Sequence, residues 1–349
     1  MPIVTAETLR QFAHNLLKAG GADETEAAVV AESLVQSNLR GHDSHGVMRI
    51  PFYLMRLKEG ALVTGARLTI VKETPAGIVG DGHWGFGQIV AQDLVNRLVA
   101  KAQQFGIACG TLRRSAHIGR LGEYAETAAA QGLSSIICAN THGAAQRVAP
   151  VGGKRPRLGT NPLCIGVPGG AQGPCILDFG TSATAEGKVR VKQIAGQQVP
   201  NGWLLDPEGN PTTDPNQLYG NPPGSILPMG GDQAYKGFGL AYMIELLCGG
   251  FSGGPVVHPN PPPPMGNCAF FIILDPRQFA GSDHLIQQAL QLEEFVRGTP
   301  LIDGCKEITL PGDPERRTLA ERQQNGIPLD DGNWAALSKL AGELSVPAP

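Results

Sequence analysis

Residues 42–49 read HDSHGVMR, and this stretch concentrates side chains that can do chemistry. It holds two of the chain's eight histidines, a serine and, four residues after the second histidine, an arginine. A histidine transfers protons near neutral pH, a hydroxyl group can orient it, and a guanidinium group grips a carboxylate through two parallel hydrogen bonds. His45, Ser44 and Arg49 are therefore candidates for a site that binds and protonates a 2-oxo or 2-hydroxy acid.

Two other interpretations of the same stretch stay open at this level. Asp43 and Ser44 could cap a solvated turn, with Arg49 incidental to it. His42 and His45 could bind a metal ion, although no further cluster of metal-ligating residues accompanies them in the sequence. Short patterns of this kind also arise by chance, so the choice depends on the rest of the chain.

Further stretches combine glycines with polar side chains that could bind a ligand. His117 precedes two glycines and an expected helix whose first amides could hold an anion, but a histidine in an ordinary strand-to-helix turn explains the pattern equally well. Thr160, Asp178 and Lys188 lie in Gly-rich loops that suit a polar ligand, although turn chemistry explains most of such residues. Lys236 stands at a helix start, where the helix dipole disfavours a cation unless an anion is bound; a solvated lysine is the alternative.

Composition excludes several classes of function. The net charge is -3 and no run of lysines or arginines occurs, so we expect no DNA or RNA partner. The seven scattered cysteines contain no C-x-x-C pair and indicate reduced thiols in a cytoplasmic protein. The first residues lack the features of a secretion signal, and no window approaches ~20 consecutive apolar residues, so no membrane partner is expected.

Hydrophobic periodicity predicts the elements that position these residues. Residues 5–39 should form two helices, the second of which starts at Asp23 with a capping box to Glu26. A short helix with Pro51 in its first turn should follow, which makes the His-rich stretch a turn between helices. From about residue 68 to 140, strands should alternate with helices, as in a sheet covered by helices.

The second half of the chain has a different pattern. Residues 150–235 are rich in Gly, Pro, Asn and Asp and should form strands and long loops. Residues 237–250 should be helical, residues 268–276 a buried strand, and residues 313–349 two polar helices separated by a turn. Because a single core stops growing near ~250 residues, we expect more than one lobe.

Residues 80–85, GDGHWG, match the G-x-G-x-x-G fingerprint between an expected strand and helix. His83 and Trp84 are bulky where a phosphate-binding loop should be slim, and no acidic residue ends the next strand to hold a ribose. In a chain with 47 glycines, chance matches are frequent. We therefore interpret this segment as an ordinary turn and expect the cofactor to bind elsewhere.

Eight motifs follow one another along nearly the whole chain: DSHGVMRIPFY, HIGRLGEYA, VGGKRPRLGTNP, LDFGTSATAEGKV, PNGWLLDPEGNPTTDP, YKGFGLAYMIELLCGGFSG, DPRQF and LPGDPERRT. Together they resemble the malate/L-lactate dehydrogenase family of NAD(P)-dependent oxidoreductases. That family also contains ureidoglycolate and sulfolactate dehydrogenases, diketogulonate reductase and the piperideine- and pyrroline-2-carboxylate reductases. The resemblance implies a homodimer and an α/β fold with a mixed sheet, helical N- and C-terminal segments and a non-Rossmann cofactor-binding architecture.

The resemblance also implies roles for the residues singled out above. His45 would be the proton donor, oriented by Ser44, while Arg49 would bind the substrate carboxylate. His117 ranks second as the acid/base, since in some members the matching histidine is proposed for that role. The residues that match contacts to NAD or NADP are His117, Ile118, Gly119, Arg120, Leu121, Asp178, Phe179, Gly180, Lys236, Pro311, Gly312 and Asp313.

Lys188 and Thr160 match positions beside the substrate, and Lys188 bears on the substrate class. Cyclic-imine reductases of the family place an aspartate there, whereas the oxo-acid enzymes commonly have lysine, which would stabilise negative charge on an alkoxide or a second carboxylate. We expect hydride transfer between NAD(P)H and C2 of a small 2-oxo or 2-hydroxy acid, with reduction of cyclic 2-imino acids as the alternative. Residues 1–60 should pack with residues 313–349, and residues 61–312 should form the catalytic body.

Overall fold

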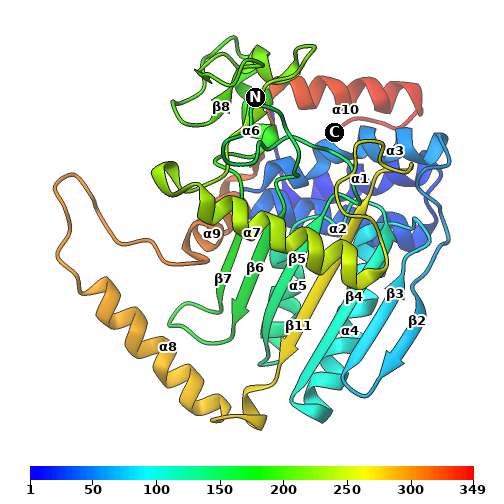
Figure 1. Ribbon diagram of the computed structural model, residues 1–349. Helices are drawn as coiled ribbons and strands as arrows, with labels where there is room; N and C mark the ends of the chain where they lie inside the picture. The colour runs from blue at the N-terminus through cyan, green and yellow to red at the C-terminus, as the bar shows by residue number, and fades with distance from the viewer.

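The computed structural model describes residues 1–349, and a seven-stranded sheet lies at its centre (Figure 1). The strand order is β2-β3-β4-β11-β5-β6-β7. The strands are β2 (Thr69–Thr74), β3 (Gly77–Asp81), β4 (Ile107–Ser115), β5 (Ser134–Asn140), β6 (Pro162–Val167), β7 (Cys175–Gly180) and β11 (Asn267–Leu274). Only β3 and β4 pair in parallel; the other five pairs are antiparallel, which confirms the predicted mixed sheet.

Strand β11 holds the middle of the sheet although it comes late in the chain. Its run of apolar residues is buried on both faces, as expected for a strand covered on both sides. On one face, Leu94 of helix α4 (Gly87–Phe105) and Tyr124 of helix α5 (Leu121–Ala130) share a core with Phe271 of β11. On the other face, helix α7 (Tyr235–Glu245) packs against Phe270 through Ile244 (Figure 1).

The two ends of the chain form a helical unit beside the sheet. Its helices are α1 (Ala6–Ala19), α2 (Glu24–Leu39), α3 (Ile50–Lys58), α9 (Asp313–Asn325) and α10 (Asp331–Glu343). A shared core joins Leu16, Leu34 and Tyr53 from the first helices to Leu337 from the last. Short strands β1 (Ile3–Val4) and β12 (Ile327–Pro328) pair the two ends directly, and the capping box predicted at the start of α2 is confirmed.

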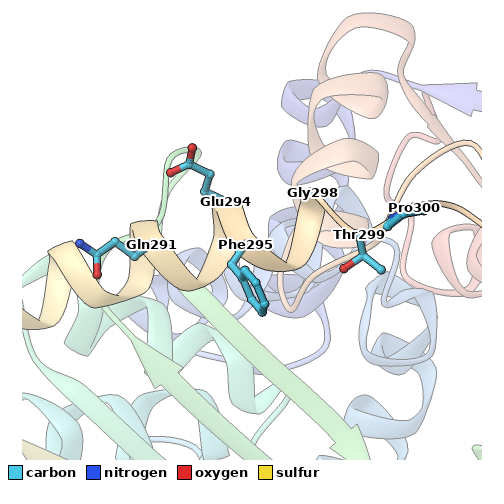
Figure 2. A pocket seen from close by; sticks show the side chains of 6 residues that line it. All are labelled: Gln291, Glu294, Phe295, Gly298, Thr299 and Pro300. Carbon is cyan, nitrogen blue, oxygen red and sulfur yellow. The ribbon is translucent and has the colours of Figure 1, made fainter.

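Two helices lie outside the elements expected from the sequence. Helix α6 (Glu186–Ile194) occupies part of the region predicted to be strands and loops, so that prediction was wrong there. Only Val189 of α6 is buried, which leaves no apolar stripe for periodicity to detect. Helix α8 (Ser282–Arg297) has no buried residue and extends away from the sheet (Figure 1). Figure 2 shows Phe295, which is 81% exposed, projecting from its last turns.

The remaining strands form a small antiparallel sheet with the order β10-β8-β9. They are β8 (Leu204–Leu205), β9 (Pro211–Thr212) and β10 (Ser225–Ile226), and they share a core with Val189 of α6. None of the helices combines the length and hydropathy that a membrane-spanning segment needs.

The GDGHWG segment forms a turn whose interior is filled by protein groups. The buried carboxylate of Asp81 accepts hydrogen bonds from Arg113 Nε at 3.0 Å and Arg114 Nε at 2.9 Å. It also accepts one from the His83 amide, while His83 and Trp84 adopt φ angles of 47° and 64°. The turn is therefore held by its own ion pairs, and both arginines are already engaged.

Candidate active site

The His-rich stretch forms the predicted turn. Residues from the N-terminal and C-terminal helices hold it in place. Two 3-10 turns, Asp43–His45 and Val47–Arg49, lead into α3, whose first turn contains a proline. Asp43 accepts hydrogen bonds from Arg322 Nη1 at 2.7 Å and Nη2 at 3.0 Å, and another from Asn38 Nδ2 at 2.7 Å. The role of Asp43 is therefore to tie the turn to helix α9.

His42 and Gly46 complete the frame of this turn. His42 Nε2 lies 3.1 Å from Glu315 Oε1 on α9, so this histidine also connects the two ends of the chain. A Cβ atom at Gly46 would overlap the side-chain amide of Asn38, whose Oδ1 accepts a hydrogen bond from the Val47 amide. Packing thus requires a glycine at position 46. No group of three or more metal-ligating side chains able to hold an ion occurs in the structure.

A cavity of about 290 Å³ brings together segments far apart in the sequence. Its walls come from the His-rich turn, the β4–α5 connection, the loop after β5, the starts of β6 and α6, and the segment before β11. Eight of the residues predicted to form a site line it: Ser44, His45, Arg49, His117, Ile118, Gly119, Leu121 and Thr160.

The two candidate acid/base histidines lie against each other in this cavity. The rings of His45 and His117 are stacked, with centroids 5.4 Å apart and planes inclined by 22°. Ser44 Oγ lies 3.0 Å from His45 Nδ1, which leaves Nε2 of His45 as its free nitrogen. Arg49 donates its Nε–H to the Ser44 carbonyl at 2.6 Å and keeps its outer guanidinium nitrogens available.

His117 forms a hydrogen bond with a tyrosine that the sequence analysis did not identify. Tyr53 Oη lies 2.7 Å from His117 Nδ1 and accepts a hydrogen bond from Gln88 Nε2 at 2.9 Å. The hydroxyl proton is therefore directed at Nδ1, which also faces the Gly119 amide at 3.4 Å. With Nδ1 accepting, we assign the proton of neutral His117 to Nε2.

Burial keeps both histidines neutral. Burial, followed by the charges of Arg49, His42 and Arg120, lowers the pKa of His45 from 6.5 to about 3. Burial first, then Arg49 and His45, holds the pKa of His117 well below its usual value. Burial likewise raises the pKa of Tyr53 to about 12. Near pH 7 the cavity thus offers a permanent cation, Arg49, beside two uncharged imidazoles.

A second, smaller cavity of about 220 Å³ lies on the other side of the β4–α5 connection. Ile118, Gly119 and Leu121 line the first cavity, whereas Arg120, between them, lines the second with Asp178 and Gly312. Asp178 Oδ2 accepts a hydrogen bond from the Gly122 amide at 2.7 Å and so caps the start of α5. Burial raises the pKa of Asp178.

Six of the predicted site residues line neither cavity: Phe179, Gly180, Lys188, Lys236, Pro311 and Asp313. Lys188 on α6 and Lys236 on α7 are exposed. The ammonium group of Lys236 lies 5.8 Å from the centre of the Tyr235 ring. Asp313 accepts hydrogen bonds from Arg297 Nη2 at 2.9 Å, Arg316 Nη2 at 2.7 Å and the Leu310 amide, so its carboxylate is engaged within the protein.

Sequence reasoning missed several residues that line the cavity or, like Tyr53, support a residue that lines it. Tyr53 carried a usable signal, because it lies four residues after Arg49 on the same helical face. Arg147 carried none, since it lies in an irregular segment, and Asn267 carried none, since nothing in the sequence shows that the first residue of β11 faces the cavity. Asn267 fixes the cavity wall by accepting from the Ile118 amide at 3.1 Å and donating to the Asn140 carbonyl at 2.7 Å.

Comparison with known proteins places this geometry in a family. Residues 4–338 match the family model of malate/L-lactate dehydrogenases. The chain is 40% identical over 346 residues to hydroxycarboxylate dehydrogenase B of Escherichia coli K12, covering 98% of this chain and 94% of that protein. A solved structure of a putative malate/lactate dehydrogenase from E. coli superposes with a TM-score of 0.93 at 39% identity, covering 99% and 96% of the two chains.

A solved delta1-piperideine-2-carboxylate reductase from Pseudomonas syringae pv. tomato has the same fold, with a TM-score of 0.82 at 30% identity over 98% of this chain and all of that one. The match of the family model over nearly the whole chain and the 40% identical relative agree with the arrangement of the motifs. The chain belongs to the malate/L-lactate dehydrogenase family.

Proposed function

We propose that this protein is an NAD(P)-dependent oxidoreductase that transfers a hydride between the nicotinamide and C2 of a small 2-oxo or 2-hydroxy acid. The observation that carries the proposal is the cavity in which Arg49, without a carboxylate partner, lies beside two neutral histidines. Arg49 supplies an anchor for the substrate carboxylate, and the histidines supply hydrogen-bonding and proton-transfer groups next to it.

In this mechanism, Arg49 orients the substrate through its two outer nitrogens, because its Nε is already bonded to the Ser44 carbonyl. His45 exchanges the proton with the substrate oxygen through Nε2, while the Ser44 hydroxyl fixes the ring through Nδ1. His117 donates from Nε2 and helps to hold the oxygen in place. The role of Thr160 in substrate contact is part of the same proposal. So is charge stabilisation by Lys188, which is exposed and outside the cavity and would have to turn toward the bound substrate.

Substrate binding would prepare His45 to act as an acid. In the free enzyme its pKa is lowered by burial and then by the charge of Arg49. A substrate carboxylate that pairs with Arg49 cancels that second contribution, so the pKa of His45 rises when the substrate binds. Protonation of the catalytic histidine is therefore coupled to occupation of the anion site.

The second cavity fits the polar part of a dinucleotide. Arg120, only 2% exposed, and Arg316 each have a buried Nε without a hydrogen-bond partner, as expected where ligand oxygens complete the bonding. Arg120, Asp178 and Gly312 would hold NAD or NADP there, and the 118–121 segment, which lines both cavities, would connect cofactor to substrate. The bound nicotinamide supplies or accepts the hydride. We propose that this non-Rossmann site, rather than the 80–85 turn, binds the cofactor.

The roles of the two histidines are tested by His45→Ala and His117→Ala, assayed for kcat with saturating cofactor. His45→Ala should lower kcat by roughly 10²–10⁴-fold, the range for a lost general acid, and His117→Ala should lower it less. A larger loss in His117→Ala would exchange their roles. Full activity in both variants would refute the proposed site.

Reduction of cyclic 2-imino acids is the alternative, favoured by the structural similarity to the piperideine-2-carboxylate reductase. The hydroxy-acid reaction is better supported, because the hydroxycarboxylate dehydrogenase is 40% identical and the reductase 30%. The lysine at position 188 agrees with an oxygen rather than a nitrogen substrate.

We also propose that the protein works as a homodimer in which helix α8 contacts the second subunit. This helix has no buried residue, and its apolar side chains Leu292 and Phe295 are 64% and 81% exposed (Figure 2). Contiguous exposed apolar side chains favour burial in an interface. Light scattering should give the dimer mass for the natural chain and a smaller mass for Phe295→Glu; a monomeric natural chain would refute the proposal.

A further inference from the structure

Arg147 is a second arginine in the wall of the substrate cavity. It lies in the loop after β5 and lines the same cavity as Arg49, His45 and His117. Its side chain is half-buried and forms neither an ion pair nor a hydrogen bond within the protein. An arginine in such a place can bind an anion that enters the cavity, because its guanidinium group has no partner in the protein to give up.

The backbone holds Arg147 in a fixed place. Its amide donates to the Leu158 carbonyl at 2.8 Å, and its carbonyl accepts from the Ile226 amide at 2.8 Å. The next residue, Val148, bridges the same two segments and is buried. A side chain that starts from such a pinned position can bind a ligand with little loss of backbone freedom.

The charges in the cavity leave a cation without a partner. Glu186 is the cavity's only carboxylate, against two arginines, and its Oε1 accepts a hydrogen bond from Tyr219 Oη at 3.1 Å. Both histidines are neutral, as described above. A substrate with one carboxylate can pair with Arg49 or with Arg147 in a given pose, but a substrate with two anionic groups can pair with both.

We propose that Arg147 determines specificity by binding a second anionic group of the substrate, a carboxylate or sulfonate at the end of the chain opposite C1. The inference rests on the proposed oxo-acid reductase function and narrows its substrate class. Arg49 binds the carboxylate next to the reacting carbon, and Arg147 binds the far anion, so the reacting C2 is held between two fixed charges.

The test compares oxaloacetate with 2-oxobutanoate, which differ only by a terminal carboxylate in place of a methyl group; 3-sulfopyruvate provides the sulfonate. In the natural enzyme, kcat/KM should be higher for the two dianions. Arg147→Met should lower kcat/KM for the dianions roughly 10- to 100-fold, the effect of a lost charge-assisted hydrogen bond, mainly through KM. Its kcat/KM for 2-oxobutanoate should change less than threefold. Arg147→Lys, which keeps the charge without the planar fork, should fall between.

Arg190→Met is the matched control. This arginine lies on α6 with its guanidinium 5.2 Å from the centre of the Tyr219 ring, and it is exposed and outside the cavity. Arg190→Met removes a positive charge close to the cavity but not from its wall. If it lowered kcat/KM for the dianions as much as Arg147→Met does, the effect would be general electrostatics and direct contact by Arg147 would be overturned. Equal losses for 2-oxobutanoate and oxaloacetate in Arg147→Met, with an unchanged melting temperature, would also overturn the inference. Absence of turnover with every 2-oxo acid would instead refute the proposed function itself.

Discussion

Replacing Tyr53 by Phe tests whether the network behind His117 matters for catalysis. The change removes the hydroxyl group of a residue that is 1% exposed, leaves Gln88 Nε2 without its partner and leaves His117 Nδ1 with only the Gly119 amide at 3.4 Å. A buried polar group left unsatisfied costs about 1–3 kcal/mol, so we expect the free energy of unfolding to fall by about that amount, chiefly through Gln88 Nε2. Without the hydroxyl proton, only the 3.4 Å contact with the Gly119 amide still favours the tautomer protonated on Nε2, and kcat/KM should fall about tenfold, or ~1.4 kcal/mol.

Tyr124→Phe is the control for this experiment. Tyr124 is fully buried on α5 and donates its hydroxyl proton to the Ile118 carbonyl, but it does not contact a histidine. It should lose similar stability and, at saturating cofactor, keep its kcat/KM for the oxo acid, because an effect through Ile118 would appear in the KM for the cofactor instead. Melting temperature and steady-state kinetics of both variants provide the measurement. If Tyr53→Phe loses stability but retains kcat/KM to the same degree as Tyr124→Phe, the tautomer argument is refuted and Tyr53 is a packing residue only.

Three further predictions concern the anion site, the turn and pH. Arg49→Lys keeps the positive charge but loses the two parallel hydrogen bonds of the guanidinium group. In steady-state assays, KM for the oxo acid should therefore rise roughly 10- to 100-fold with kcat nearly unchanged. A changed kcat at constant KM would contradict this prediction. Asp43→Asn weakens the ion pair with Arg322. Because Asp43 is 45% exposed, the free energy of unfolding should fall by only about 1 kcal/mol. A double-mutant cycle with Arg322→Gln, measured by urea denaturation, should show this coupling, and its absence would contradict the role of Asp43 in tying the turn to α9. The folded-state pKa of His45, about 3, lies below its unfolded value of 6.5, so its stabilisation is complete above pH 6.5 and is lost as pH falls toward 3, at up to ~1.4 kcal/mol per pH unit. Denaturation of His45→Gln should therefore be less pH-dependent between pH 6.5 and 4, and an unchanged profile would show that His45 is not buried in its neutral form.

The local elements were predictable because their signals are local. The capping box of Asp23 and Glu26, the proline at the start of α3 and the apolar run of β11 each specify structure within a few residues. The position of β11 between β4 and β5 was not predictable, since it depends on pairing between strands more than 120 residues apart in sequence for β5 and more than 150 for β4. Helix α6 was missed because it buries almost no side chains, whereas helix α8 was overlooked although its apolar residues, among them Leu292 and Phe295, recur at helical spacing.

The candidate site likewise contains residues that local sequence predicts and residues that only the tertiary fold brings together. His45, Ser44 and Arg49 are close in sequence, and the need for a proton donor beside an anion clamp could be read from them directly. The contact between His117 and Tyr53 spans 64 residues and follows only from how α3 packs against the β4–α5 connection. Arg147 was missed for the same reason, because nothing near it in the sequence indicates that the loop after β5 faces the cavity.

The central claim is most directly tested by following NADH and NADPH oxidation at 340 nm with a panel of 2-oxo acids and with piperideine- and pyrroline-2-carboxylate, using His45→Ala as the inactive control. We predict turnover of oxo acids by the natural enzyme, with kcat/KM above that for either cyclic imine, and a kcat at least roughly 10²-fold lower in the variant. Preference for an imine, or equal rates in enzyme and variant, would contradict the account.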